Sequence, residues 1–345
     1  MALKRCGIDP LVDLEGAVVS EALVRHHSTT GKVSIRKPER GDEWSVVLVR
    51  RRALAASLLQ AAEAVGANIQ CGWRVKDVDF DKREVTVVAQ GTNGTTKEGG
   101  ENSKKVKYDL LVGADGVRSI TRTLLSNHLS TKEIPFPVKT LDDTMEYQVA
   151  IIPRPWKEII LPQKHWTHSC PPASMHTWSD TTTGGTGLGF PIRRDSSTSL
   201  MDQFMVCVIF PGGKLGKMKQ NGFSGYTAAL NGLFADWTSD SRLDLAQLLA
   251  EDDNVPSIGG TCVWSEALSH PESGVVLIGD SGHGMWPSLG QGCNAALESV
   301  AVFADAIDAV KGSISNGAAG CRNVDFSSAS SRELVHAISI EYDGL

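Results

Sequence analysis

The segment of residues 274–300 constrains the fold of this 345-residue chain more than any other. Four consecutive apolar residues, 275–278, are typical of a central strand in an α/β sheet. Asp280 follows at the carboxyl end of that strand, where open α/β sheets bind their ligands. Pro287 ends any earlier helix, and an alanine-rich helical pattern begins a few residues later. The segment therefore predicts a buried strand, an acidic turn and a glycine-rich entry into a helix.

The glycine-rich entry indicates what kind of ligand this turn accepts. Gly290 and Gly292 flank Gln291 just before the predicted helix. Glycines let a flat ligand approach the backbone, and a helix N-terminus offers free N–H groups and a partial positive charge. These properties favour a planar ring that becomes anionic when it is reduced. An ordinary βα turn with capping glycines is the alternative interpretation.

A second segment with the same organisation lies far upstream. Residues 108–119 contain an apolar strand pattern that runs into Gly-Ala-Asp-Gly, with Asp115 at the strand end and Gly116 after it. Arg118 or Arg122 could reach an anionic group as a charge-assisted donor. One such turn is common, but two of them in one chain are not. We therefore expect Asp115 and Asp280 to fold together along one groove and to hold a single long ligand.

Composition excludes several function classes. The net charge of −6 gives no basic surface for nucleic acid or for an anionic membrane, and no apolar run approaches the ~18 residues needed to cross a bilayer. Seven scattered cysteines without CxxC spacing predict reduced thiols of an intracellular protein. Cys293 is expected to pack as a small apolar residue. The irregular group of His165, His168, Cys170 and His176 predicts a loop without metal.

The remaining patterns predict one α/β domain whose sequence is interrupted by a β-rich insertion. Apolar spacing in residues 51–65 predicts a helix, and residues 90–105 and the tail after about 312 are expected to be loose. Residues 73–80 and 84–89 are expected to form a hairpin, and residues 147–152, 187–191 and 204–210 an antiparallel sheet. Two helices are expected at residues 226–237 and 243–250, followed by a strand near 260–266 that returns to the α/β domain.

Taken together, these segments resemble the FAD-dependent aromatic-ring monooxygenases of the para-hydroxybenzoate hydroxylase group, and within it the kynurenine 3-monooxygenase-like proteins. Three motifs carry the resemblance: Val49-x-Arg51-x-x-Leu54, Gly113-Ala114-Asp115-Gly116 with Ser119 and Arg122, and Gly279-Asp280 with His283, Pro287, Gly290-Gln291-Gly292 and Asn294. The third motif is the most specific of them. The resemblance covers most of residues 1–310.

Three departures from the family pattern limit what the resemblance carries over. The chain contains no Gly-x-Gly-x-x-Gly turn, which in the family cradles the ADP pyrophosphate, so we expect a truncated form of a longer, catalytic protein. Glu298-Ser299 stands where the family usually has Glu-Asp. The arginine that kynurenine-type enzymes use for the substrate carboxylate has no clear counterpart, and Arg25 is a loose substitute. The identity of the substrate therefore does not carry over.

The resemblance implies an FAD/NAD(P)-binding Rossmann-like three-layer domain, truncated at its N-terminus, with an inserted antiparallel β-sheet substrate domain. The implied bounds are residues 1–140 and 255–315 for the FAD-binding domain and 141–254 for the substrate domain, with a loose tail at 316–345.

The implied activity is hydroxylation of an aromatic or other small organic substrate with NAD(P)H and O2, through a flavin C4a-hydroperoxide. A flavin-linked reductase or epoxidase of isoprenoid-type substrates, or a truncated non-catalytic scaffold, are the alternatives. The oligomeric state is left open. The implied FAD contacts are Arg51, Asp115, Gly116, Gly279, Asp280, Pro287, Gly290, Gln291, Gly292 and Asn294, with Pro287 and Gly290 nearest the reacting part of the flavin. His283 is expected to be a structural donor.

Overall fold

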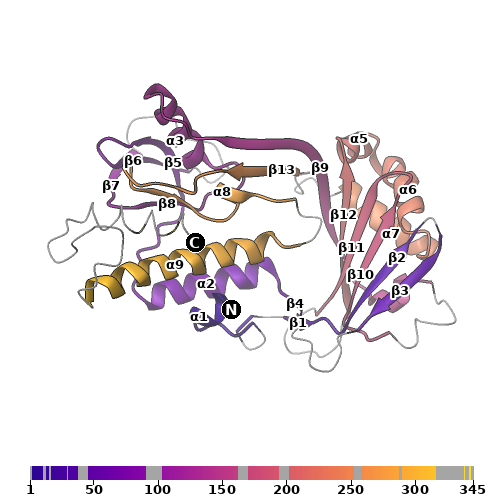
Figure 1. Cartoon of the computed structure of the whole chain (residues 1–345). Helices are drawn as coiled ribbons and strands as arrows, with labels where there is room; N and C mark the ends of the chain where they lie inside the picture. Colours follow the sequence, from indigo (N-terminus) through magenta and orange to yellow (C-terminus); the bar gives the residue numbers. More distant parts are fainter. Residues whose placement is uncertain are drawn as a thin grey trace. The chain divides into compact units, whose positions relative to one another are not determined.

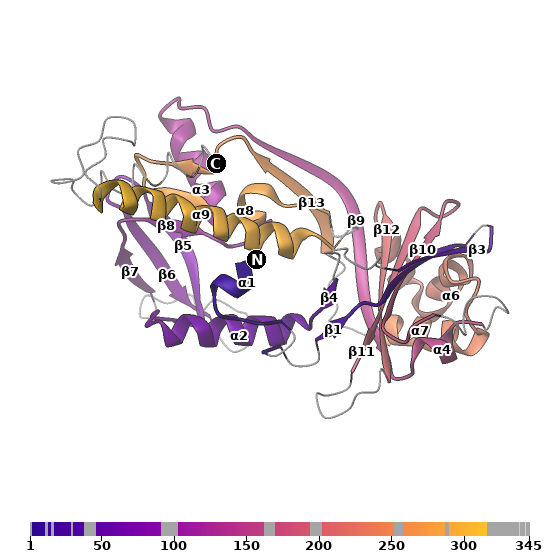
Figure 2. The ribbon, with the colours of Figure 1, turned by 60° about the horizontal axis from the view of Figure 1, so that its bottom comes forward.

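The computed structural model describes residues 2–10, 13–14, 17–28, 30–37, 46–90, 103–161, 170–193, 202–251, 258–286, 290–315, 338 and 342. The chain divides into two compact units (Figures 1 and 2). The first unit contains residues 3–67 and 142–260, and the second contains residues 68–141 and 261–345. Residues 3–67 thus group with the predicted insertion. None of the helices described is both long enough and apolar enough to cross a membrane.

The first unit is built on most of a seven-stranded sheet. Its strand order is β13-β9-β12-β11-β10-β2-β3. The neighbours β9 to β12 pair antiparallel, as the sequence predicted, whereas β10 pairs with β2 in parallel. The strands are β2 (Ala22–His27), β3 (Lys32–Arg36), β9 (Val138–Ile152), β10 (Ser174–Asp180), β11 (Gly185–Ile192), β12 (Gln203–Pro211) and β13 (Ile258–Ser265).

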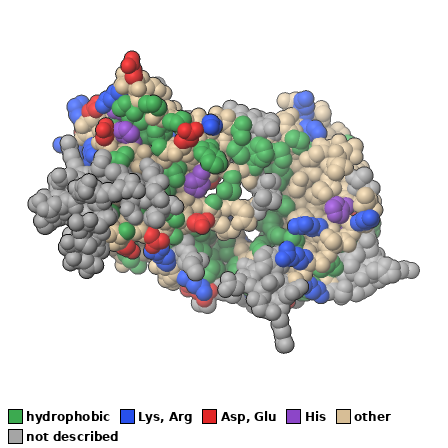
Figure 3. Space-filling model, viewed as in Figure 1, with side chains coloured by type: hydrophobic (Ala, Val, Ile, Leu, Met, Phe, Trp, Pro, Cys, Tyr) green, Lys and Arg blue, Asp and Glu red, His purple; other side chains and the backbone are tan. Residues whose placement is uncertain are grey.

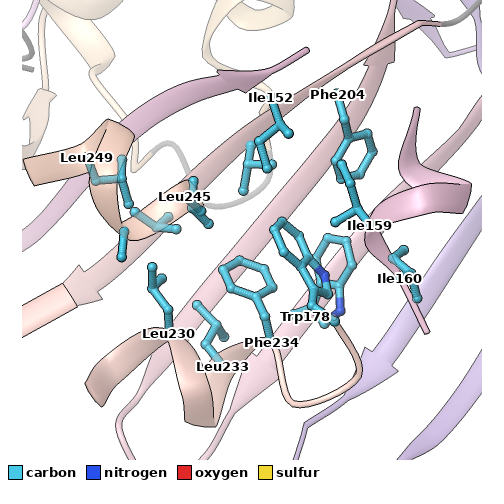
Figure 4. Close-up of a cluster of buried hydrophobic side chains, with 14 of the residues drawn as sticks. Ile152, Ile159, Ile160, Trp178, Phe204, Leu230, Leu233, Phe234, Leu245 and Leu249 are labelled. Atoms are coloured by element: carbon cyan, nitrogen blue, oxygen red, sulfur yellow. The ribbon is translucent and has the colours of Figure 1, made fainter. Parts of the chain in front are cut away.

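Helices α6 (Gly222–Leu233) and α7 (Ser239–Glu251) lie against one face of this sheet (Figure 1). They confirm the two helices predicted from the apolar spacing of residues 226–237 and 243–250. The core between helices and sheet is mostly aromatic and branched aliphatic, and Figure 4 shows Trp178, Phe204 and Phe234 directed toward one another within it. The smaller elements of this unit are α1 (Ala2–Arg5), β1 (Val18–Val19), β4 (Val47–Leu48), α2 (Arg51–Ala64), α4 (Trp156–Ile159) and α5 (Lys214–Gln220).

A buried polar chain crosses this apolar core. The His26 imidazole places Nδ1 2.6 Å from an Asp236 carboxylate oxygen and Nε2 2.9 Å from Nδ1 of His176. Trp178 donates its indole N–H to the other Asp236 oxygen at 2.9 Å. Burial, together with neighbouring His26, holds the pKa of His176 well below its ordinary value, so His176 is neutral in the folded chain. The sequence predicted a loop here, which is wrong for His176, because it lies in strand β10 and is buried among aromatic side chains of the core. The described residues contain no metal-binding cluster. His165 and His168 lie outside the described residues.

The second unit contains two small sheets, ordered β14-β15-β8 and β5-β6-β7. β5 (Trp73–Asp79) and β6 (Glu84–Ala89) form the predicted hairpin, and β7 (Ser103–Lys107) adds to it. The expectation of a loose segment is therefore wrong for residues 103–105, while residues 91–102 lie outside the described part. β8 (Leu111–Gly113), α3 (Ile120–Thr131), β14 (Ser269–His270), β15 (Val275–Leu277), α8 (Asp280–His283) and α9 (Gly292–Ser315) complete the unit.

The expected loose tail is also wrong where the structure describes it. Helix α9 runs to Ser315. Ile338 and Tyr342 are both buried, and Tyr342 packs with Val276 and Ile278 of the β15 segment. The Tyr342 hydroxyl donates to the carbonyl oxygen of Leu277 at 3.3 Å. The low apolar content of this part of the sequence gave no signal for these two buried residues.

Figure 3 shows the charged side chains on one face of the molecule. Lys and Arg side chains lie there in several small groups.

Candidate functional site

The two acidic turns meet at one edge of the small parallel pair in the second unit. β15 and β8 pair in parallel, with Val275 opposite Leu111 and Leu277 opposite Gly113. β15 is the middle strand of its sheet and is buried throughout, as its run of apolar residues predicted. Asp115 and Asp280 therefore both follow the carboxyl ends of neighbouring parallel strands, which is where α/β sheets bind ligands.

The Asp115 carboxylate is held by its own loop. It accepts hydrogen bonds from the Ser119 hydroxyl at 2.6 Å and from both the main-chain N–H and the hydroxyl of Thr121 at 3.0 Å. Ser119 in turn caps α3 by accepting from the main-chain N–H of Arg122. Burial opposes ionisation of Asp115, but these donors outweigh it and lower the pKa of the carboxyl. Asp115 is thus an ionised anchor that fixes the loop before α3.

Arg122 connects the two turns. Its guanidinium is buried and donates to the main-chain carbonyls of Val117, in the first turn, and of Ser281, in the second. The Ser281 hydroxyl strengthens the connection, because it lies within hydrogen-bond distance of the carbonyls of Gly113 and Ile278. Arg122 therefore acts as a structural tie, which removes it as the anion donor that the sequence offered. Arg118 remains exposed.

Glycine is required where the second turn meets α9. Gly279 has φ 62° and ψ −139°, a backbone conformation that is essentially restricted to glycine. A Cβ on Gly279 would lie 2.9 Å from the Cβ of Ala296 in α9. Gly284 makes a similar close approach, because its Cβ would lie 3.0 Å from a methyl group of Val117. The glycine backbone of the Asp280 turn is therefore packed closely against side chains of α9 and of the Asp115 loop.

Asp280 differs from Asp115 because none of the described residues donates a hydrogen bond to its carboxylate. The residue is nevertheless about half-buried. Burial raises the pKa of Asp280, and the nearby His283 partly offsets this rise. A partly desolvated carboxylate without a donor destabilises the folded chain. A ligand hydroxyl that donated to Asp280 would remove this cost.

The start of α9 lies beside Asp280. A Cβ on Gly292 would lie 4.0 Å from an Asp280 oxygen, and Gly290 has φ 63° with open space where a Cβ would stand. The first turn of α9 contains no acidic residue, and Asn294 donates its side-chain amide to the side chain of Gln291 at 3.0 Å. Cys293 is exposed, so the expectation that it packs is wrong. Pro287 lies outside the described residues.

His283 reaches from the acidic turn to the second turn of α9. Its Nε2 lies 2.6 Å from the hydroxyl oxygen of Ser299, which is buried. Ser299 is the residue that departs from the family's Glu-Asp pair. The sequence predicted that His283 makes a structural hydrogen bond, and this contact confirms it. The roles of Thr121 and Ser281 were missed, although a hydroxyl residue that follows an acidic turn is a recognisable capping signal.

Two further arginines from the sequence lie in the first unit. Arg51 is the first residue of α2 and is exposed. Arg25 is exposed on β2, whose residues alternate so that Ala22, Val24 and His26 face the core instead. Neither side chain is taken up by a hydrogen bond or ion pair among the described residues.

Comparison with known proteins relates the chain to flavoprotein oxygenases. Residues 14–179 match the model of a family described as an FAD binding domain. Kynurenine 3-monooxygenase 2 of Aspergillus niger is 28% identical over 251 residues, and kynurenine 3-monooxygenase of Xanthomonas campestris pv. campestris is 22% identical over 315 residues. The matches cover 70% and 89% of this chain but only 43% and 60% of the two relatives. The chain thus spans about half the length of these curated relatives.

Solved structures share the fold at low sequence identity. PqsL of Pseudomonas aeruginosa, described as a probable FAD-dependent monooxygenase, has a TM-score of 0.62 at 15% identity over 99% of this chain and 79% of its own. A mutant of 2-methyl-3-hydroxypyridine-5-carboxylic acid oxygenase has a TM-score of 0.60 at 16% identity over 98% of this chain and 71% of its own. In sequence the chain is similar to FAD-dependent aromatic monooxygenases, and it shares the α/β fold of solved structures from such proteins.

Proposed function

We propose that the chain is part of an FAD-dependent monooxygenase that uses NAD(P)H and O2 to hydroxylate a small aromatic substrate. One observation carries the proposal, namely the half-buried Asp280 carboxylate that has no donor among the described residues and lies beside the amide end of a 24-residue helix. The similarity to flavoprotein oxygenases suggests FAD as the ligand of this site. The described cysteines are all free, which supports a reducing intracellular setting.

The residues around Asp280 suit the sugar-like and ring portions of FAD. Asp280 would accept hydrogen bonds from hydroxyl groups of the flavin's side chain. Gly290 and Gly292 leave the backbone open to a flat ring, and the main-chain N–H groups at the start of α9 would stabilise negative charge on its edge. Gln291 and Asn294, joined by their own hydrogen bond, would keep this turn in place.

The Asp115 loop is proposed to serve the pyrophosphate region. Because the Asp115 carboxylate is occupied by Ser119 and Thr121, it would act by fixing the loop rather than by direct contact. Gly116, with φ 78°, lets the backbone of this loop turn toward the ligand. Arg51 keeps its predicted role toward the pyrophosphate charge, since its guanidinium is exposed.

When bound, FAD accepts electrons from NAD(P)H and activates O2 for transfer of one oxygen atom to the substrate. The protein's part is to bind, to orient and to exclude water from the reacting face. Pro287 and Gly290 are proposed to shape that dry face. This chemistry requires no general acid or base from the chain, and we assign none.

The test is to measure the affinity of the Asp280→Asn variant for FAD, with flavin fluorescence as the signal. A hydrogen bond to a charged group is worth about 1.5–3 kcal/mol, so the variant should bind FAD roughly 10- to 100-fold more weakly than the wild type. Asp79→Asn, which alters an exposed carboxylate of the same unit paired with Lys82, is the matched control and should bind normally. The proposal fails if the wild type binds no FAD, or if Asp280→Asn binds it as tightly as the wild type.

The same variant separates a binding role from a structural one. Because the folded-state pKa of Asp280 is raised, ionisation of this residue opposes folding at neutral pH; the penalty shrinks as pH falls through the folded-state pKa and is gone below the unfolded-state value of 3.8. Asp280→Asn should therefore melt at a higher temperature than the wild type at pH 7 without FAD, and the difference should vanish in acid. A lower melting temperature at pH 7 would indicate that Asp280 is structural.

A further inference from the structure

The hydrogen bonds of Ser299 define how His283 is protonated. The Ser299 hydroxyl donates to the main-chain carbonyl of Ala295 at 2.9 Å, and its oxygen also lies 2.6 Å from Nε2 of His283. A serine hydroxyl has a single hydrogen, so when it donates to Ala295 its oxygen can only accept from the histidine. With the serine hydrogen directed to Ala295, Nε2 of His283 is the donor of this hydrogen bond and the Ser299 oxygen is its acceptor.

This donor joins two elements that are already in close contact. The main-chain N–H of His283 donates to the carbonyl of Gly279, which closes the Asp280 turn. Gly279 packs against Ala296 of α9. In the chain, Ala296 lies between Ala295 and Ser299, the two residues that the serine hydrogen bond joins. The residues proposed to face the flavin, 290–294, come directly before this contact in the chain. The first turns of α9 are therefore held beside Asp280 both by the packing of Gly279 on Ala296 and by the His283–Ser299 hydrogen bond.

We propose that His283 is a positioning residue for the flavin, which acts by donating to Ser299 and so holds the amide end of α9 at a fixed place beside the Asp280 carboxylate. The inference rests on the proposed function, because it assigns a role within the same site. Ser299 takes the place of the aspartate usual in the family. The Ser299 hydroxyl is buried and can accept the histidine N–H at this place in α9.

A double-mutant cycle tests the inference. His283→Ala and Ser299→Ala should each weaken FAD binding by about tenfold, the effect of one lost buried hydrogen bond. The double variant should bind no more weakly than either single variant, because both remove the same contact. His283→Gln places an amide N–H near the position of Nε2, so it should restore binding to within about threefold of the wild type. Thr227→Ala is the control, since Thr227 makes the same kind of bond to the carbonyl four residues back without a second partner.

A second readout does not depend on FAD. Amide hydrogen exchange of residues 292–299 should be faster in His283→Ala and Ser299→Ala than in the wild-type apoprotein, and His283→Gln should restore the slow rate. Additive losses of affinity in the double variant, or unchanged exchange of α9, would overturn the inference. If the wild type binds no FAD, the proposed function fails for this chain, and the exchange rates alone still decide whether His283 positions α9.

Discussion

The imidazole of His176 is enclosed by aromatic side chains in the core of the first unit. Its ring centroid lies 4.5 Å from that of Trp156 and 5.7 Å from that of Trp178. A neutral histidine suits this environment, and the His26–Asp236 pair anchors it through Nδ1. The residue thus contributes to stability only while it stays unprotonated.

We predict that the first unit loses stability in mild acid because of His176. Its folded-state pKa is depressed, so the unfolded chain binds more protons as pH falls below about 6.5, and folding is increasingly opposed below that pH. His176→Asn keeps a polar group toward His26 but cannot charge. Its melting temperature should therefore change less between pH 7 and pH 5 than that of the wild type. Equal slopes in thermal melts of the two proteins would contradict this role.

Sequence reasoning identified the positions of both acidic residues but not their different states. The strand patterns before Asp115 and Asp280 sufficed to place them, because a buried apolar run and a glycine turn are local signals. The Asp115 carboxylate accepts hydrogen bonds because Ser119 and Thr121 follow its turn at the right positions. No described residue does the same for Asp280. The prediction of a loop at His176 was wrong, since the partners that hold it in the core, His26 and Asp236, are 150 and 60 residues away in the chain.

Strand β11 shows how one element fixes the packing of the core around it. Gly185, Gly187 and Gly189 alternate along it on one face, and each is covered by a phenylalanine ring. A Cβ on Gly187 would lie 2.6 Å from the ring of Phe234, and one on Gly189 would lie 2.2 Å from the ring of Phe204. The glycines are buried and leave room for the aromatic rings at the centre of the sheet.

Gly187→Ala should destabilise the chain by about 1–3 kcal/mol, the usual cost of overpacking a filled core. Adding Phe234→Leu should recover part of that loss, because the smaller side chain frees the space the new methyl needs. Gly216→Ala in helix α5 is the control, since a Cβ there meets only the end of Glu146 at 3.6 Å. Urea denaturation measures all three. A Gly187→Ala variant as stable as the wild type would refute the close packing.

The antiparallel strands and the α6–α7 pair were predictable because alternation and helical spacing are local. The parallel pairing of β10 with β2 was not, since the pairing joins residues 22–27 to residues 174–179. Nothing in either segment specifies the other. The pairing of strands so far apart in the sequence depends on the fold of the whole chain.

At the scale of the whole molecule, the buried residues near the C-terminus are part of the second unit's core. Tyr342 packs edge-on against Phe303 of α9, with ring centroids 5.4 Å apart, and its hydroxyl donates to Leu277. The side chain thus links α9 to the central strand β15 of the small sheet.

Tyr342→Ala should destabilise the second unit by about 3–5 kcal/mol, as for other buried aromatic residues, and Tyr342→Phe by about 0.5–1.5 kcal/mol through the lost hydrogen bond. Thermal unfolding followed by circular dichroism gives both values. Tyr147→Phe, at a half-buried position in β9, is the control. A Tyr342→Ala variant that melts with the wild type would mean that the C-terminal segment does not support the fold.

The parallel β2–β10 pair has a practical consequence for anyone who wishes to transplant part of this molecule. Residues 142–260 look like a self-contained insertion, yet β10 inside them is flanked by β2 from near the start of the chain, and His176 bonds to His26 on that strand. An excised 142–260 fragment would expose a long strand edge and is a candidate for aggregation. A chimera would need both pieces, spliced by a linker, to carry this module into another host.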